Sequence, residues 1–574
     1  MLSGALFAST SPPFDFVIAP WLGMALLACA LDREPPSPSA GGGRWRVIFR
    51  GGARGLAFGF AANAVALRFV PGVITRFTPL PWAVGALALA LLAMAQGLRW
   101  AAAAWVHRAL VRWRVPRPLA FAVGVYAGTF VPAIFPWNPA GGATLWPELL
   151  QLADTIGERG VSALMALTSA LAAFAVQALR DARKGKGGDS ASSKRPALAM
   201  ALGAAFLALG SYVHGRLRMA EVDALRAHAT TAKVALVQPS VGATERWDRQ
   251  RARQILATLT ELTRTAERDG AELTVWHESA YPYELRHGAT HAPETPWTLL
   301  QPGVHGPILA GVVLHGTPLV EGGPDRYNSA LVVDRNGALS APYDKIHLLW
   351  FGETVPLADV FPWIRRTFAR GLGLVQGSTQ VVLDSGKVRA SVLICFEDTL
   401  PAAGREALSL SPNLLVNVTN DAWFTAEGSA DAPPRPPSEP RSSSDSRHRD
   451  GLEGADEASL ESELHLRMAI LRSIEGRRDM VRAVNFGPTT WVDAAGRVRA
   501  RYASTSPGTL LTTPALLETP PTLYVRYGDM PFAVFALLAT LAATLVLESG
   551  ATKRQRRQLQ AKPDADAYTA SKPE

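Results

Sequence analysis

The stretch KVRASVLICFEDTL, from Lys387 to Leu400, determines how the rest of the sequence is interpreted. Its apolar residues alternate as in a buried strand up to Ile394, and an acidic loop begins after Cys395. Reactive groups in α/β sheets lie at strand ends, so Cys395 is a candidate nucleophile. On residue type alone a packing role is favoured, because free cysteine is among the most buried residues. Motifs elsewhere in the chain reverse that preference.

The composition predicts that part of the chain lies in a membrane. The 574 residues exceed one ordinary core, and 48% hydrophobic residues with a positive mean hydropathy are too apolar for a purely soluble protein. The net charge of +9 does not indicate nucleic acid binding, because the basic residues stand between apolar runs. The two cysteines, Cys29 and Cys395, lie in unlike contexts, so we expect no disulfide, no metal site and no cofactor.

Seven apolar runs of spanning length predict a multispan membrane domain over residues 1–213 and a transmembrane helix over residues 530–548. The runs are Phe14–Leu31, Ala53–Phe69, Pro81–Val106, Pro118–Phe135, Val161–Leu179, Pro196–Val213 and Met530–Leu547. Basic segments separate them at residues 33–54, 108–117, 180–195 and 549–574. By the positive-inside rule these segments are cytoplasmic, which places residues 214–529 on the other side.

Residues 214–529 have the pattern of an α/β domain, in which strands alternate with helices. The predicted strands are Ala232–Gln238, Leu273–Trp276, Pro307–Leu314, Ser329–Val333, Gln380–Leu383, Val388–Ile394, Asn413–Val418, Val481–Asn485 and Thr489–Val492. Helical periodicity covers Arg249–Arg268 and Leu464–Glu475. Residues 427–459 are rich in Pro, Ser and charge without an apolar face, so we interpret them as a disordered insertion.

Three strand ends carry polar residues in chain order: Glu278, Lys345 and Cys395. A thiol needs a base, and a carboxylate whose pKa is raised by burial can accept its proton. A fixed ammonium group stabilises the oxyanion that forms when the sulfur attacks a carbonyl. Together the three residues are a complete set for acyl transfer. Each residue taken alone is weak evidence for catalysis, because Glu278 is equally compatible with a solvated loop and Lys345 with a surface ion pair to Asp344.

These residues stand in motifs that resemble a known superfamily. VWHESAYP around Glu278, YDKIHLLWFGETVP around Lys345 and LICFEDTLP around Cys395 resemble the three catalytic motifs of the nitrilase superfamily. With its multispan N-terminal half, nearly the whole chain resembles the apolipoprotein N-acyltransferase family. The resemblance implies membrane helices joined to an α/β domain of the nitrilase type, an αββα sandwich.

The resemblance also implies roles for single residues. Cys395 would be the nucleophile, Glu278 the general base and Lys345 the oxyanion stabiliser. Glu353, in FGE, would hold the lysine and the base in place.

Further supporting roles follow from the same resemblance. Glu397 and Trp247 would belong to mobile walls around the acyl chain, and Asn328, in DRYNSALVVD, would support the site. Phe396 stands where tyrosine is common in the family, which removes any hydrogen bond from a hydroxyl there.

The activity that the resemblance implies is N-acyl transfer at the bacterial inner membrane, with the catalytic domain on the periplasmic side. The donor would be a phospholipid, and the acyl group would pass through a thioester on Cys395. The acceptor would be the α-amine of the diacylglyceryl-cysteine of an apolipoprotein, in the final step of lipoprotein maturation. Two alternatives stay open: a membrane-tethered amidase with the same three residues, and a catalytically silent scaffold that recruits partners through residues 427–459. A large apolar cavity favours the transferase, and a small polar pocket favours the amidase.

Overall fold

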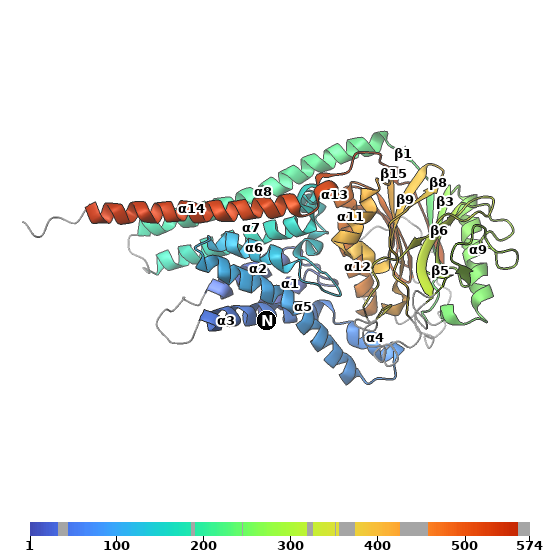
Figure 1. Cartoon of the computed structure of the whole chain (residues 1–574), viewed down its shortest axis with the longest axis horizontal. Coiled ribbons are helices and arrows are strands. Elements are labelled where there is room, and N and C mark those ends of the chain that lie inside the picture. Colours follow the sequence, from blue (N-terminus) through green and yellow to red (C-terminus); the bar gives the residue numbers. More distant parts are fainter. Residues whose placement is uncertain are drawn as a thin grey trace, which may run out of the picture.

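The computed structural model describes residues 1–32, 44–184, 190–243, 245–317, 325–350, 352–354, 373–424, 457–504 and 506–560. A bundle of long helices occupies one end of the molecule, and two β-sheets with their covering helices occupy the other (Figure 1). The predicted insertion at residues 427–459 falls almost wholly outside the described residues.

Helices make up the described part of the N-terminal half. They are α1 (Leu2–Ala8), α2 (Ala19–Asp32), α3 (Arg44–Ala66), α4 (Val70–Phe77), α5 (Trp82–Arg112), α6 (Arg117–Gly128), the short η1 (Pro139–Ala143) and η2 (Pro147–Leu150), α7 (Ala153–Arg183) and α8 (Ser190–His228). Near the other end of the chain, α13 (Leu523–Tyr527) leads into α14 (Met530–Gln560), which runs back along the bundle (Figure 1).

Three described helices are long and apolar enough to cross a membrane, namely Trp82–Arg112, Ala153–Arg183 and Lys194–His228. The segments Arg50–Ala66 and Val70–Arg76 meet at a bend of 51° and add a fourth span if they count as one. The apolar helices Ala19–Asp32 and Met530–Leu545 are shorter. By length and composition the N-terminal half is thus a membrane domain.

Two predicted spans differ from the structure. α6 ends at Gly128, so the span predicted over Pro118–Phe135 is wrong in its second half, where Pro132 and Pro136 disfavour a helix. The first predicted span begins at Ala19 and not at Phe14. In addition, α8 runs without a break through residue 213 to His228.

The strands form two large sheets and a small pair. Their bounds are β1 (Thr230–Thr231), β2 (Val234–Gln238), β3 (Leu273–Trp276), β4 (Glu284–Arg286), β5 (Ile308–His315), β6 (Arg326–Val333), β7 (Tyr343–Asp344), β8 (Val382–Ser385), β9 (Val388–Ile394), β10 (Leu414–Asn420), β11 (Met480–Asn485), β12 (Thr489–Val492), β13 (Val498–Tyr502), β14 (Gly508–Thr512) and β15 (Ala515–Leu516). One sheet has the order β13-β12-β11-β10-β9-β8, the other has the order β14-β2-β3-β5-β6-β7 with β4 beside β5, and β1 pairs with β15.

Apolar side chains pack the two large sheets face to face. Val275 of one sheet belongs to the same buried cluster as Val392 and Val418 of the other. The helix α9 (Ala252–Arg268) covers the outer face of the sheet that contains β2 and β3. The helices α11 (Pro401–Ser409) and α12 (Glu457–Gly476) cover the outer face of the sheet that contains β9 and β10, on the side of the membrane helices (Figure 1). The predicted fold class, a multispan helical membrane domain plus an αββα sandwich, is confirmed.

Parallel strands bring the predicted site residues to one region. β9 runs parallel to β10, and in the other sheet β3 runs parallel to β2 and β5. The carboxyl ends of parallel strands lie at one edge of a sheet, where substrates reach the backbone. Cys395 therefore emerges beside Asn420, at the end of β10, while Glu278 emerges from β3 opposite to them.

Candidate active site

Cys395 stands where β9 passes into the short helix η4 (Cys395–Thr399). Its φ of +53° lies in the left-handed region, which costs free energy for a residue other than glycine. Asn417 Nδ2 holds this turn by donating to the carbonyl oxygens of Leu393 at 3.0 Å and of Cys395 at 3.3 Å. The side chain of Cys395 stays partly exposed at the strand end.

The thiol of Cys395 is protonated at rest. Burial raises its pKa well above the ordinary value, and the Glu278 carboxylate raises it further, whereas Lys345 acts in the opposite direction. A reaction at this sulfur therefore requires a base that removes the proton as the sulfur attacks.

Glu278 is a buried carboxylate that bridges the two sheets. Its residue is only 8% exposed. Asn328 Nδ2 donates to its Oε1 at 2.7 Å, and the backbone N–H of Asn420 donates to its Oε2 at 2.9 Å. Burial raises the pKa of Glu278 above the ordinary glutamate value, the Glu353 carboxylate adds to the shift, and Lys345 opposes it. Glu278 thus has the environment of a proton acceptor and not that of a solvated loop acid.

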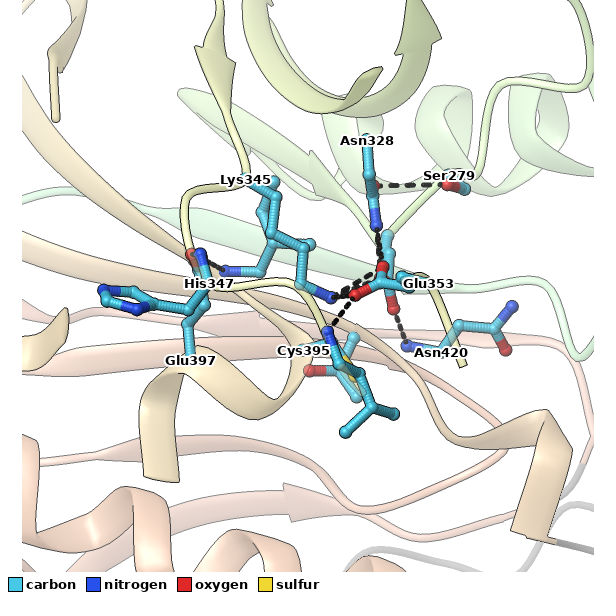
Figure 2. A network of polar contacts seen from close by, with 12 residues as sticks. Ser279, Asn328, Lys345, His347, Glu353, Cys395, Glu397 and Asn420 are labelled. Atoms are coloured by element: carbon cyan, nitrogen blue, oxygen red, sulfur yellow. Dashed lines mark hydrogen bonds and ion pairs between the residues drawn. The ribbon is translucent and has the colours of Figure 1, made fainter. Parts of the chain in front are cut away.

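Lys345 is 1% exposed and follows β7. Its Nζ lies 2.8 Å from both carboxylate oxygens of Glu353 and 3.6 Å from Glu278 Oε1. Burial alone would lower the pKa of this ammonium group, but the Glu353 and Glu278 carboxylates outweigh it and raise the pKa. Lys345 therefore stays charged, and its side chain points toward Glu353 beside Cys395 (Figure 2).

Asn328 and Glu353 complete this polar cluster. Asn328 Nδ2 donates to Glu353 Oε1 at 3.0 Å as well as to Glu278. The backbone carbonyl oxygen of Asn328 accepts from the backbone N–H of Lys345 at 2.8 Å. The backbone N–H of Leu349 fixes the other Glu353 oxygen at 2.9 Å. Glu353 thus contacts the Lys345 ammonium group, and Asn328 contacts the Glu278 carboxylate.

Glu397 is a buried carboxylate that accepts several hydrogen bonds. It is 0% exposed and accepts hydrogen bonds from Tyr343 Oη at 2.9 Å and from three backbone N–H groups. Those groups belong to Ile346 at 3.0 Å, His347 at 2.9 Å and Ile394 at 2.8 Å. These bonds connect the loop after Lys345 to the strand before Cys395, and the role of Glu397 in a mobile wall around the acyl chain stays a prediction.

Two aromatic residues complete the set predicted from the sequence. Trp247 ends the short helix η3 (Glu245–Trp247), but its side chain falls outside what the structure describes, so its role as a wall stays a prediction. The Phe396 ring lies 5.8 Å from Lys345 Nζ, a cation–π contact that needs no hydroxyl group. The alternative interpretation of Lys345, a surface pair with Asp344, does not hold, because Lys345 is 1% exposed and Asp344 contacts His287.

A buried ionic cluster behind Cys395 could not be predicted from local spacing, because its members come from four separate elements. His465 Nε2 lies 2.9 Å from Asp398 Oδ1, and His465 Nδ1 lies 3.3 Å from Asp421 Oδ1. Arg482 lies 3.5 Å from Asp398 and 3.4 Å from Asp421. Asp398 belongs to the turn of Cys395, and Asp421 follows the residue whose N–H holds Glu278. The cluster therefore connects the turn that contains Cys395 to the segment whose Asn420 N–H binds Glu278.

A cavity of about 550 Å³ is lined by Ile346, Thr354 and Phe396, which directly follow Lys345, Glu353 and Cys395 in the sequence. Its lining comes from the membrane domain, chiefly residues 129–134, and from the catalytic domain, chiefly residues 346–350 and Phe396. Most of these side chains are apolar. Within the described ranges, no group of three or more His, Cys, Asp or Glu side chains is arranged to hold a metal ion.

Two family profiles match this chain. The profile described as apolipoprotein N-acyltransferase N-terminal domain matches residues 3–171, and the profile described as carbon-nitrogen hydrolase matches residues 233–432. A helical membrane domain joined to such a hydrolase domain defines the class of protein, a membrane-bound member of the carbon-nitrogen hydrolase, or nitrilase, superfamily.

Relatives with full-length similarity narrow this class. The apolipoprotein N-acyltransferase of Brucella melitensis is 30% identical over 529 residues, 88% of this chain and 86% of the relative. Those of Azotobacter vinelandii and Geobacter metallireducens are 30% and 28% identical, covering 94% and 95% of this chain and 92% and 93% of the relatives. A carbon-nitrogen hydrolase structure from Helicobacter pylori aligns with 53% of this chain and 95% of its own at 15% identity and a TM-score of 0.33. The chain belongs to the apolipoprotein N-acyltransferase family.

The pH dependence of stability tests the ionic cluster around His465. Burial alone would lower the pKa of His465, but Asp398 and Asp421 outweigh it and raise the pKa from 6.5 to about 10. A pKa raised by folding means that the protonated imidazole stabilises the fold fully below pH 6.5, and that this stability is lost as the pH rises through about 10. We expect His465→Gln to lose about 3 kcal/mol at pH 6, because two buried carboxylates lose a cation.

Thermal unfolding of the purified protein in detergent measures this effect. The difference between the wild-type and H465Q midpoints should be largest near pH 6 and should shrink toward pH 10. Two midpoints that differ by the same amount at every pH would mean that His465 is not a buried cation.

Proposed function

We propose that this chain is a phospholipid:apolipoprotein N-acyltransferase, which carries out the final step of bacterial lipoprotein maturation. It moves a fatty acyl chain from a phospholipid to the α-amine of the diacylglyceryl-cysteine at the N-terminus of an apolipoprotein. One observation carries the proposal beyond family membership. The Glu278–Lys345–Glu353 cluster lies beside Cys395 (Figure 2), and the residues that directly follow three of these positions, Ile346, Thr354 and Phe396, line a large, mainly apolar cavity between the membrane helices and the catalytic loops.

In the first half-reaction, the Cys395 sulfur attacks an ester carbonyl carbon of the phospholipid while Glu278 takes the thiol proton. The carbonyl oxygen becomes an oxyanion, which the Lys345 ammonium group stabilises. When the carbon–oxygen ester bond breaks, Glu278 returns the proton to the leaving alkoxide, and a lysophospholipid departs. The acyl group stays on Cys395 as a thioester.

In the second half-reaction, the acceptor's free α-amine attacks the thioester carbonyl. Glu278 takes a proton from the nitrogen, Lys345 again supports the oxyanion, and the carbon–sulfur bond breaks. The proton passes to the sulfur, which regenerates the thiol of Cys395 and releases the N-acyl product. Glu278 needs a raised pKa for both steps, because it accepts and returns a proton in each.

The size and lining of the cavity favour the transferase over the amidase. A thioester survives only if water is kept from it, and apolar side chains such as Ile134, Leu348 and Leu349 line the cavity. A fatty acyl chain fits such a lining, whereas a small polar amide does not need it. The silent scaffold is disfavoured because Glu278, Lys345 and Cys395 are all present and lie in one site.

The arrangement of basic residues supports a periplasmic catalytic domain in the inner membrane. α7 runs away from the catalytic sheets and ends near Arg183 and Lys184, and α8 runs back toward them (Figure 1). α14 likewise leads away from the catalytic domain, and its last turns carry Lys553 and Arg554. The positive-inside rule puts these ends in the cytoplasm and the catalytic domain on the opposite side.

A transfer assay tests the proposed function. Purified full-length protein is incubated with a phospholipid and a synthetic diacylglyceryl-cysteine peptide, and the N-acyl peptide is measured by mass spectrometry. Cys395→Ala and Glu278→Gln should each lower the rate by at least about 1,000-fold. Cys29→Ala is the matched control, because Cys29 lies in α2 of the membrane domain, and it should keep the wild-type rate.

Release of free fatty acid with the peptide left unmodified would identify the amidase-type reaction instead. Unreduced N-acyl peptide formation by C395A would also contradict the mechanism.

The pH dependence of acylation tests the role of Glu278. Only the ionised carboxylate accepts the thiol proton, so the rate of single-turnover acylation should rise with pH through the raised pKa of Glu278. Glu353→Gln removes a neighbouring negative charge, which lowers the pKa of Glu278. We therefore expect the acidic limb of the profile to move to lower pH by about one unit.

Asp344→Asn is the control, because Asp344 precedes Lys345 in the sequence but does not contact the carboxylate pair. D344N should leave the acidic limb of the pH–rate profile unchanged. A limb that stays fixed or moves to higher pH in E353Q would show that Glu278 is not the titrating base.

A further inference from the structure

A buried arginine stands in the membrane-domain wall of the cavity. Arg99 lies within α5, one of the helices long and apolar enough to cross a membrane, and is only 8% exposed. A charged side chain in such a helix is costly and is retained where it pairs with another charge or binds a ligand. The sequence carries this signal too, because Arg99 interrupts an apolar run.

The protein partners of Arg99 are neutral. Its Nη2 donates to the Thr129 carbonyl oxygen at 3.1 Å and to Asn138 Oδ1 at 2.6 Å. Among the described residues, no carboxylate forms an ion pair with Arg99, and its Nε and Nη1 have no hydrogen-bond acceptor. Part of the guanidinium group thus remains available to a ligand in the cavity.

The carboxylate nearest in the network is committed to other groups. Glu158 Oε1 accepts from Asn138 Nδ2 at 2.7 Å, so Asn138 stands between Glu158 and Arg99. Glu158 Oε2 pairs with Arg472 at 2.8 Å. Arg472 also pairs with Glu475 at 3.0 Å. This junction between the two domains therefore leaves Arg99 without a direct counter-charge.

The second cation of the cavity wall is already neutralised. Arg159 Nη1 pairs with Asp529, and its guanidinium group stacks over the Phe130 ring at 4.5 Å from the centroid. Among the described residues that line the cavity, two are arginines, and Arg99 is the one suited to an anionic ligand.

We propose that Arg99 binds the phosphate group of the phospholipid donor in this cavity. This inference rests on the proposed function, which supplies the phospholipid as substrate. Guanidinium groups form strong charge-assisted hydrogen bonds to phosphate oxygens, and a buried cation gains most from such a partner. Phe396, the neighbour of Cys395, lines the same cavity. A lipid anchored by its phosphate at Arg99 directs its ester toward the nucleophile.

A binding experiment tests this site without any chemistry. Full-length protein carrying Cys395→Ala is titrated by calorimetry with dihexanoyl phosphatidylglycerol, with dihexanoylglycerol, which lacks the phosphate, and with inorganic phosphate. Adding Arg99→Gln should weaken phosphatidylglycerol binding by about 10- to 100-fold and leave dihexanoylglycerol binding unchanged. Arg99→Lys keeps the charge and should fall between the two.

Arg117→Gln is the matched control, because Arg117 begins α6 and pairs with Asp32 away from the cavity. It should bind all three ligands as the parent protein does. Unchanged phosphatidylglycerol binding by R99Q, or an equal loss of both lipids, would overturn the inference. Inorganic phosphate bound as tightly as the phospholipid would make this a site for free phosphate and would overturn the lipid assignment.

Different experimental outcomes would reject the role of Arg99 and the proposed function. N-acyl peptide formed by wild-type protein, together with unchanged lipid binding by R99Q, would reject only the role of Arg99. Phosphate-dependent lipid binding that is lost in R99Q, together with no N-acyl product, would reject only the transferase.

Discussion

Two carboxylates, the buried one of Glu278 and the partly buried one of Glu353, share one buried ammonium group, that of Lys345. The cluster carries one negative charge more than it carries positive charges, so one proton is held more tightly than an exposed glutamate would hold it. That excess raises the pKa of Glu278, as the proposed role of a base requires, and it raises the pKa of Lys345 in the same environment. Such a cluster is stable only if its geometry is fixed, because removing any partner leaves a buried charge uncompensated. Asn328 supplies the neutral donor, and the Asn420 N–H ties the base to the opposite sheet.

The same demand for fixed charges extends outward from the site. Glu397 gathers four hydrogen bonds that hold the Lys345 loop against the Cys395 strand, and His465 joins the turn of Cys395 to Asp421. α12, which carries His465, also packs against the membrane helices and carries Arg472 into the domain junction. Buried polar contacts thus hold Cys395, Glu278 and the junction between the two domains in place.

Much of the fold was predictable because strands and spans leave periodic signals. All nine predicted strands occur, and the strand that leads to Cys395 is β9, Val388–Ile394. The two-residue strands β1, β7 and β15 leave no period to detect, and the end of α6 at Gly128 depends on prolines inside an apolar run. Glu278, Lys345 and Cys395 were predictable from their motifs. The partners of Glu397 and His465 were not, because long-range packing alone brings those residues together.

Mass spectrometry of the purified protein after incubation with a phospholipid alone is the most direct test of a thioester on Cys395. We predict a fatty acyl mass increment on the peptide that contains Cys395. The increment should be cleared by a diacylglyceryl-cysteine peptide with a free amine, should persist with the same peptide acetylated on that amine, and should be absent in Cys395→Ala. No adduct with any phospholipid, or an adduct that persists in Cys395→Ala, would contradict acyl transfer through this cysteine.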